Sequence, residues 1–348
     1  MIKPKHLKRG DTVAVVSCSK GTLGEPWAIH KLDIAKKRLE EDYGFKVLVM
    51  PNALKGIEYL DNHPEARAKD LMDAFKNPEV KGIINAIGGD DSIRLLPYID
   101  FDVIRNNPKI FTGFSDTTSN HMMMYKAGLV SYYGACLMCD FAEYVSINDY
   151  TKKMINDTLI EPKDTLDIPS SPYFYDEEDG KIWWKKENIN TSTPYHKEEI
   201  GYEVIQGKGV VEGELLGGCI DVFVEIIGTA IWPNKDEWKD KIMFLETSED
   251  DMSKDHLIWV LRNLAAQGIF DVVKGIIVGK PAFRNKYEPY KEAYLQVVGK
   301  EANHPELPIL CNVNFGHAKP IGVIPIGVKA RLNVDNKTIT LLEPATEK

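Results

Sequence analysis

A serine at a predicted strand-to-helix turn is the residue of this chain best placed for chemistry. Residues 109–118 read Lys-Ile-Phe-Thr-Gly-Phe-Ser-Asp-Thr-Thr, so Ser115 follows an apolar run and a glycine and precedes a helix-like run from Asp116 to Tyr125. Such a turn lifts the hydroxyl out of a sheet and points the next backbone N–H at a carbonyl under attack. The sequence therefore predicts a serine nucleophile, which needs a base and an orienting acid from elsewhere in the chain.

Among the eight histidines, His317 has the surroundings that best suit a catalytic base. It follows the apolar run 309–315, and Gly316 before it frees the backbone and leaves room for the ring. His121 and His256 fall inside helical patterns, where packing or capping is the ordinary role. The other five histidines lie in polar segments, so His317 is the predicted base.

Glu246 is the predicted acid, because it ends a strongly apolar strand pattern and is followed by Thr247 and Ser248. A carboxylate in that place can accept a histidine N–H and hold the imidazole in the required tautomer. The chain order is then Ser115, Glu246, His317, which is one of the orders known for serine triads.

An oxyanion hole requires two N–H donors near the nucleophile, and losing one donor typically costs about 3 kcal/mol of barrier. The N–H of Asp116 supplies one by position, and Gly89, in the Gly88-Gly89 turn after a neighbouring strand pattern, is the predicted second donor. A Gly-Gly turn can equally cradle a phosphate. A non-catalytic phosphate- or nucleotide-binding protein is therefore an alternative from a different functional class.

Strand and helix patterns alternate through the first half of the chain, which predicts an α/β fold with a parallel sheet covered by helices. Loops with functional residues then gather at the carboxyl ends of the strands. The expected strands are 12–17, 45–50, 81–87, 110–111 and 129–133, and the expected helices are 27–43, 64–75 and 116–125.

The second half divides into an irregular segment and another α/β region. Residues 161–209 mix prolines and aromatics with charges and show no long periodic element, which is typical of a connecting or lid region. We predict a first domain at 1–165, the connecting region at 166–209 and a second domain at 210–348. In the second domain we expect strands at 210–216, 241–245, 273–279 and 309–315, a turn at Gly217-Gly218, helices at 220–227 and 252–266, and a hairpin at 330–342.

Bulk properties exclude several classes of protein. The 348-residue chain has a net charge of −9 and no basic stripe, which argues against a nucleic-acid partner. Its apolar runs are too short for a membrane span, and the N-terminus lacks a signal-peptide pattern. Five cysteines without framework spacing suit a reducing cytoplasm, and the Cys136–Cys139 pair is interpreted as core rather than as a metal site.

Several of these segments together resemble the LD-carboxypeptidase family of serine peptidases, including its microcin C self-immunity branch. The matching pieces follow the family's order over almost the whole chain. They are residues 87–92 (Ile-Gly-Gly-Asp-Asp-Ser), 112–118 (Thr-Gly-Phe-Ser-Asp-Thr-Thr), 213–218 (Gly-Glu-Leu-Leu-Gly-Gly), 244–247 (Phe-Leu-Glu-Thr) and 315–317 (Phe-Gly-His).

The resemblance implies a Ser-His-Glu triad of Ser115, His317 and Glu246, and an oxyanion hole formed by Gly89 and Asp116. It also implies a flavodoxin-like N-terminal domain, a β-rich swivelling C-terminal α/β domain, a homodimer, and neither a metal nor an organic cofactor. One residue departs from the pattern: much of the family has asparagine after the glycine pair, where this chain has Cys219.

Two substrate classes occur in that family. Murein-recycling members cut before the terminal D-alanine of a tetrapeptide, whereas self-immunity members cut the amide that joins an aminoacyl group to a nucleotide-like moiety. The aromatic-rich connecting region favours the second class, because Trp183 or Trp184 can stack on a base, although either can instead pack the loop onto the body. Asp90, beside the predicted oxyanion turn, is a further candidate for substrate contact.

Overall fold

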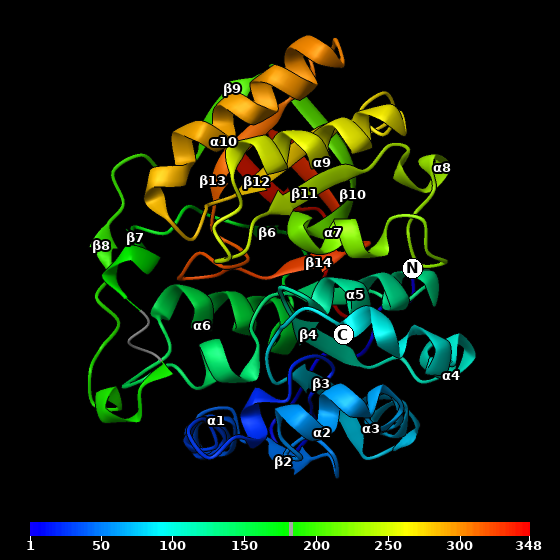
Figure 1. Ribbon diagram of the computed structural model, residues 1–348, viewed down its shortest axis with the longest axis vertical. Helices are drawn as coiled ribbons and strands as arrows, with labels where there is room; N and C mark the ends of the chain where they lie inside the picture. The colour runs from blue at the N-terminus through cyan, green and yellow to red at the C-terminus, as the bar shows by residue number, and fades with distance from the viewer. Residues whose placement is uncertain (181–183) are drawn as a thin grey trace.

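Two β-sheets, one built mainly from each half of the chain, organise the computed structural model, which describes residues 1–180 and 184–348 (Figure 1). The predicted α/β class is confirmed. The first sheet lies in the lower half of Figure 1 and the second in the upper half, with helices around both.

The first sheet carries the order β14-β5-β4-β3-β1-β2. Its strands β1 to β5 pair in parallel, and the order β2-β1-β3-β4-β5 is that of flavodoxin-like sheets. The bounds are β1 Thr12–Val16, β2 Lys46–Val49, β3 Val80–Asn85, β4 Ile110–Gly113, β5 Ser131–Tyr133 and β14 Ile324–Ile326.

The helices of the first half follow from apolar spacing and from residues that favour helix starts. α3 begins at Pro64, where the missing proline N–H costs no hydrogen bond, and buries Ala68, Leu71 and Phe75 along one face. α5 is buried along nearly its whole length, so it holds the residues after Ser115 rigidly. The helices are α1 His30–Glu41, α2 Ile57–Asn62, α3 Pro64–Lys76, α4 Phe101–Asn106, α5 Thr117–Lys126 and α6 Asp149–Ile155.

The second sheet carries the order β6-β16-β15-β10-β11-β12-β13-β9. Its central strands β10 to β13 are parallel and its outer pairs are antiparallel. The strands are β6 Leu166–Asp167, β9 Glu203–Gln206, β10 Val210–Cys219, β11 Ile242–Glu246, β12 Gly275–Gly279, β13 Ile309–Val313, β15 Lys329–Asn333 and β16 Thr338–Leu341.

In the described residues, the α-helices of the second half are α7 Ile220–Ile226, α8 Lys235–Trp238, α9 Lys254–Ala266 and α10 Tyr287–Tyr294. Figure 1 shows α9 and α10 lying side by side over the sheet, and their residues are in contact. The described part of the connecting region contributes the short strands β7 Tyr173–Phe174 and β8 His196–Lys197, which pair with each other. It also contributes β6 and β9 at the edges of the second sheet.

The predicted turn at Gly217-Gly218 is wrong, because β10 continues through both glycines to Cys219. Gly217 pairs with Phe244 and Gly218 with Leu245 in the neighbouring parallel strand β11. A side chain at Gly217 would collide with that strand, since its Cβ would lie 2.7 Å from the Phe244 carbonyl carbon. The glycines therefore permit close approach of two strands instead of a change of direction.

One strand connects the two halves. The chain leaves the second sheet at the end of β13 and enters the first sheet as β14, which pairs antiparallel with β5. The loop between them, residues 314–323, therefore lies where the two sheets meet. Within the described ranges, no helix has the length and apolar character needed to cross a membrane.

Candidate active site

Ser115 occupies the sharp turn between β4 and α5. Its backbone is left-handed, with φ of 65°, which is a strained conformation for a serine and a usual one for an exposed nucleophile. The Ser115 N–H donates to the Tyr133 hydroxyl over 3.0 Å. Gly88 faces the turn so closely that a Cβ there would lie 2.6 Å from the Ser115 Cβ, so only glycine fits.

His317 lies in the loop between β13 and β14 and faces Ser115. Its Nε2 is 3.0 Å from the Ser115 Oγ, and its Nδ1 is 2.7 Å from Glu246 Oε2. Gly316, with φ of 77°, turns the chain against the Glu246 carboxylate, where a Cβ would overlap it. The structure thus brings together the three side chains that the sequence singled out. They contact one another in the order that a nucleophile, a base and an acid require.

Glu246 ends β11 and is almost fully buried, at 1 % exposure. A buried carboxylate is stable only when donors satisfy it. The Tyr133 hydroxyl donates to Oε1, while the His317 ring and the His317 N–H face Oε2, the latter at 3.3 Å. Glu246 is therefore held in one orientation by Tyr133 of the first sheet and by His317 of the loop between β13 and β14.

The charge around His317 favours the imidazolium. Burial alone would lower the pKa of His317, but the carboxylates of Glu246 and Glu249 outweigh burial and raise this pKa well above its usual value. Glu249 Oε2 lies 3.0 Å from His317 Nε2. Sequence reasoning missed Glu249, and the signal available was a second carboxylate three residues after Glu246 in the same loop.

The Gly88-Gly89 turn follows β3 and lies against the nucleophile turn. A Cβ at Gly88 would be 3.3 Å from the Asp116 nitrogen, which begins α5 as its N-cap. The backbone N–H groups at a helix start carry partial positive charge. The two predicted oxyanion donors, Gly89 and Asp116, therefore lie on adjacent backbone segments beside Ser115.

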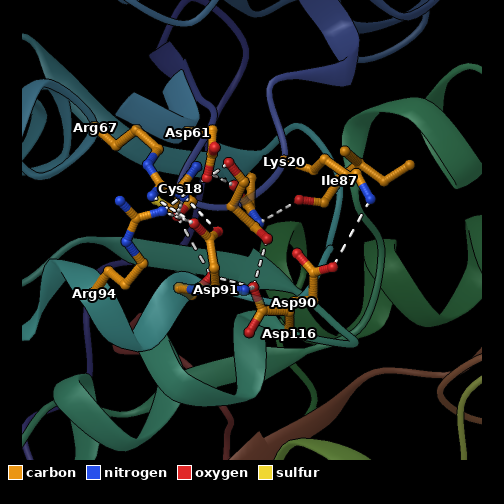
Figure 2. Close-up of polar contacts among 12 residues, drawn as sticks. Cys18, Lys20, Asp61, Arg67, Ile87, Asp90, Asp91, Arg94 and Asp116 are labelled. Carbon is orange, nitrogen blue, oxygen red and sulfur yellow. Dashed lines mark hydrogen bonds and ion pairs between the residues drawn. The ribbon is translucent and has the colours of Figure 1, made fainter. Parts of the chain in front are cut away.

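The Asp116 side chain ties these two segments together (Figure 2). Its Oδ2 accepts hydrogen bonds from the Ser19 hydroxyl, the Asp91 N–H at 3.0 Å, and the Ser92 N–H and hydroxyl at 2.8 and 2.7 Å. Burial raises the pKa of the Asp116 carboxyl, and the donating Ser19 and Ser92 groups oppose that shift. Asp116 thereby fixes the loop that follows Gly89.

Arg67 of α3 supports the same loop from behind (Figure 2). Its guanidinium pairs with both oxygens of Asp91, at 2.6 and 2.8 Å, and donates to the Ser19 carbonyl at 3.0 Å. Burial opposes ionisation of Asp91, but Arg67 and Arg94 outweigh burial and lower its pKa. The Arg67 side chain is 1% exposed and that of Asp91 is 20% exposed, so the guanidinium side of this pair is shielded from solvent.

A cavity of about 260 Å³ opens in front of Ser115. Trp184 is one of its lining residues, and its ring lies 5.6 Å from that of Trp27. Trp183, the other predicted stacking residue, lies outside the described residues. Asp90 also lines the cavity, with a carboxylate oxygen 3.8 Å from the Lys20 ammonium nitrogen. Among the described residues, the lining is formed by Lys20, Thr22, Ile87, Gly88, Gly89, Asp90, Phe114, Ser115, Cys139, Glu177, Trp184, Glu249, Asp250, His317 and Lys319.

Cys219 lies behind the site, at the end of β10. Its N–H donates to the Thr118 hydroxyl at 3.0 Å, and its Sγ is 3.4 Å from Asp221 Oδ2. Cys219, Glu246 and His317 are the one group in the described part of the chain whose donor atoms could surround a metal, lying within 4.8 Å of one another. Burial raises the pKa of the Cys219 thiol well above its usual value, which disfavours the thiolate that a metal would need.

Comparisons with family models and with known proteins all indicate one family. The N-terminal domain of LD-carboxypeptidases, peptidase family S66, matches residues 13–134, and the C-terminal domain of the same family matches residues 212–332. The chain is 29% identical to the microcin C7 self-immunity protein MccF of Escherichia coli, over 88% of this chain and 87% of that protein. It is 30% identical to a probable murein peptide carboxypeptidase of Bacillus subtilis, over 97% and 94%.

Solved structures agree with these relatives. An MccF-like protein from Streptococcus pneumoniae in complex with AMP superposes with a TM-score of 0.87 at 33% identity, covering 95% of this chain and 98% of that one. MccF in complex with aspartyl sulfamoyl adenosine superposes with a TM-score of 0.84 at 26% identity, covering 100% of both chains.

Proposed function

The chain belongs to the LD-carboxypeptidase family, a family of serine-type hydrolases, and on that premise we propose that Ser115, His317 and Glu246 are its catalytic triad. The observation that carries this proposal is the line of contacts from Ser115 Oγ through the imidazole to Glu246, at 3.0 and 2.7 Å. The alternative hypothesis of a non-catalytic phosphate-binding protein does not explain why these three side chains are in contact.

In this mechanism, His317 Nε2 accepts the hydroxyl proton as Ser115 Oγ attacks the scissile carbonyl carbon. Glu246 stabilises the resulting imidazolium, and the N–H groups of Gly89 and Asp116 stabilise the oxyanion. His317 then gives the proton to the leaving nitrogen. A water molecule, deprotonated by the same imidazole, hydrolyses the acyl-enzyme and regenerates the serine.

For the substrate, we propose a peptidyl- or aminoacyl-nucleotide of the microcin C type, cleaved at the amide next to the nucleotide-like part. Trp184 lines the cavity and offers a surface on which a base can stack. Two structural relatives bind compounds that contain adenosine, namely AMP and aspartyl sulfamoyl adenosine. Asp90, with Lys20, is the proposed polar contact at the cavity edge.

The second candidate is a murein tetrapeptide carboxypeptidase, which the similarity to the Bacillus subtilis protein favours. Incubation of the purified protein with aspartyl sulfamoyl adenosine and, separately, with murein tetrapeptide distinguishes the two by the products released. The first candidate predicts free amino acid from the adenosine compound and little D-alanine from the tetrapeptide. Release of D-alanine alone would reverse the choice.

We further propose that the enzyme works in the cytoplasm as a homodimer without a cofactor, as expected from the sequence. Size-exclusion chromatography with light scattering tests the assembly, which should have twice the 39.3 kDa mass of the chain. A species of single-chain mass at working concentration would contradict the dimer.

A further inference from the structure

A second carboxylate lies at the reactive nitrogen of the imidazole. Glu249 Oε2 is 3.0 Å from His317 Nε2, the same atom that lies 3.0 Å from the Ser115 hydroxyl oxygen. Glu249 belongs to the loop between β11 and α9, and its side chain is 31% exposed, whereas that of Glu246 is fully buried. Glu249 is therefore partly open to solvent, whereas Glu246 is enclosed by the protein.

This contact determines the protonation state of the base. An ionised carboxylate can only accept hydrogen bonds, so a ring nitrogen that faces one must carry a proton. With Glu246 at Nδ1 and Glu249 at Nε2, each nitrogen of His317 faces a carboxylate oxygen, and this arrangement favours the imidazolium. A general base needs a free lone pair on Nε2, so this arrangement holds the base in an inactive form.

The other charged groups around the cavity leave an excess of negative charge near His317. Lys20 faces Asp90, and Lys319, in the same loop as His317, donates to the Cys139 carbonyl at 3.1 Å. Glu177 and Asp250 also line the cavity, and the Cys219 thiol lies behind Glu246. Four lining carboxylates outnumber the two lysines and the His317 imidazolium, and the remaining negative charge favours a cationic group on the ligand.

Resting on the hydrolytic function proposed above, we propose that Glu249 is a positioning residue that keeps His317 protonated until a substrate with a free amino group beside its scissile carbonyl draws the carboxylate away. The ammonium replaces the imidazolium as the partner of Glu249. The Nε2 proton then passes to solvent water, and the neutral nitrogen accepts the Ser115 proton during attack. Substrates without that cation leave the base protonated.

The test uses the free enzyme first, because the substrate is itself a proposal. A fluorophosphonate modifies an activated serine, so its rate of inactivation against pH follows neutral His317. Glu249→Gln removes a negative charge from Nε2 and lowers the pKa of His317. The acidic limb of the rate profile should therefore move to lower pH, by about one unit. The matched control Asp251→Asn removes a charge of the same sign from the same loop, at a carboxylate that pairs with Lys286 at 2.6 Å, and should keep the wild-type limb.

Turnover then tests the role of the substrate. In the wild type, kcat/KM for an aminoacyl sulfamoyl-adenosine should exceed that for its N-acetylated form by about tenfold or more, and Glu249→Gln should narrow this ratio. In Glu249→Gln, the acidic limb of the pH profile of kcat/KM should move, because kcat/KM reports the free enzyme. The acidic limb of the kcat profile should stay, because kcat reports the substrate complex, in which Glu249 no longer faces His317.

Coincident inactivation limbs for the wild type and Glu249→Gln, or an equal shift in Asp251→Asn, would overturn this inference and leave the triad intact. If the fluorophosphonate modifies Ser115 in none of the three proteins, that result would instead contradict the proposed function.

Discussion

Tyr133 donates its hydroxyl hydrogen to the buried carboxylate of Glu246, across the boundary between the two sheets. The same hydroxyl accepts the Ser115 N–H at 3.0 Å. One phenol therefore contacts the nucleophile turn and the acid, and it couples the position of β11 to that of β4. Burial raises the pKa of Tyr133 well above its usual value, so the hydroxyl stays protonated and remains a donor.

Tyr133→Phe should lower kcat/KM by about 10- to 100-fold, because a buried oxygen of Glu246 loses its donor at a cost of about 1–3 kcal/mol. The matched control is Tyr132→Phe, since Tyr132 is also fully buried and donates to the Ala345 carbonyl at 2.9 Å, away from the site. Steady-state kinetics on both variants checks the prediction. Equal activity losses in the two would show that Tyr133 acts only through stability.

Arg67→Lys should lower kcat/KM by about 10- to 100-fold, because lysine cannot reproduce the two-pronged contact with Asp91 and the oxyanion loop would shift. Arg94→Lys is the matched control. Arg94 also pairs with Asp91, at 2.9 Å, but its side chain is 42% exposed, so its replacement should cost little. An Arg94→Lys variant as impaired as Arg67→Lys would refute the role given to the buried pair.

Trp184→Ala should raise KM for an aminoacyl-nucleotide by about 5- to 150-fold, which corresponds to the 1–3 kcal/mol of one stacked base. Trp184→Phe keeps an aromatic surface and should recover much of the loss. Cleavage of a tetrapeptide, where there is any, should not change. If Trp184→Ala binds the nucleotide substrate as tightly as the wild type does, stacking is carried by another residue.

Glu225, on α7, should make stability depend on pH. Burial, together with the charge of Asp116 and other nearby carboxylates, raises its pKa from 4.5 to about 7, and its Oε2 has no hydrogen-bond partner among the described residues. The folded state then holds a proton that the unfolded state has lost. Stability therefore falls as pH rises from 4.5 to about 7, and the full cost remains above that range.

Glu225→Gln removes this cost. The variant should be more stable than the wild type by roughly 1 kcal/mol at about pH 8. This value allows for solvent screening, because the Glu225 side chain is only partly buried. The gain in stability should vanish near pH 4. Urea denaturation at both pH values measures it, with exposed Glu58→Gln as the control. A gain that is the same at both pH values would contradict the assignment.

Sequence patterns were sufficient to predict the elements that carry the site. Ser115 follows an apolar strand and Glu246 ends one, and the alternation of strands with amphipathic helices placed both at carboxyl ends of parallel strands. Such local signals are strong because periodicity and glycine placement are properties of neighbouring residues.

The contacts among Ser115, His317 and Glu246 were predicted from the sequence, but other contacts between distant segments were beyond that reasoning. The short strand β14 joins the first sheet from the far end of the chain, and nothing in its three residues specifies β5 as partner. Tyr133 and Arg67 look like ordinary strand and helix residues, and only the tertiary fold brings them to Glu246 and Asp91. The turn predicted at Gly217-Gly218 was wrong because glycine pairs occur where two strands approach closely as well as in turns.

The most direct test of the central claim compares the turnover of Ser115→Ala with that of the wild type on aspartyl sulfamoyl adenosine and on murein tetrapeptide. The melting temperatures of the two proteins are measured alongside. The triad account predicts a loss of at least about 10³-fold on whichever substrate the wild type cleaves, with an unchanged melting temperature. A folded Ser115→Ala protein that retains wild-type turnover would contradict it.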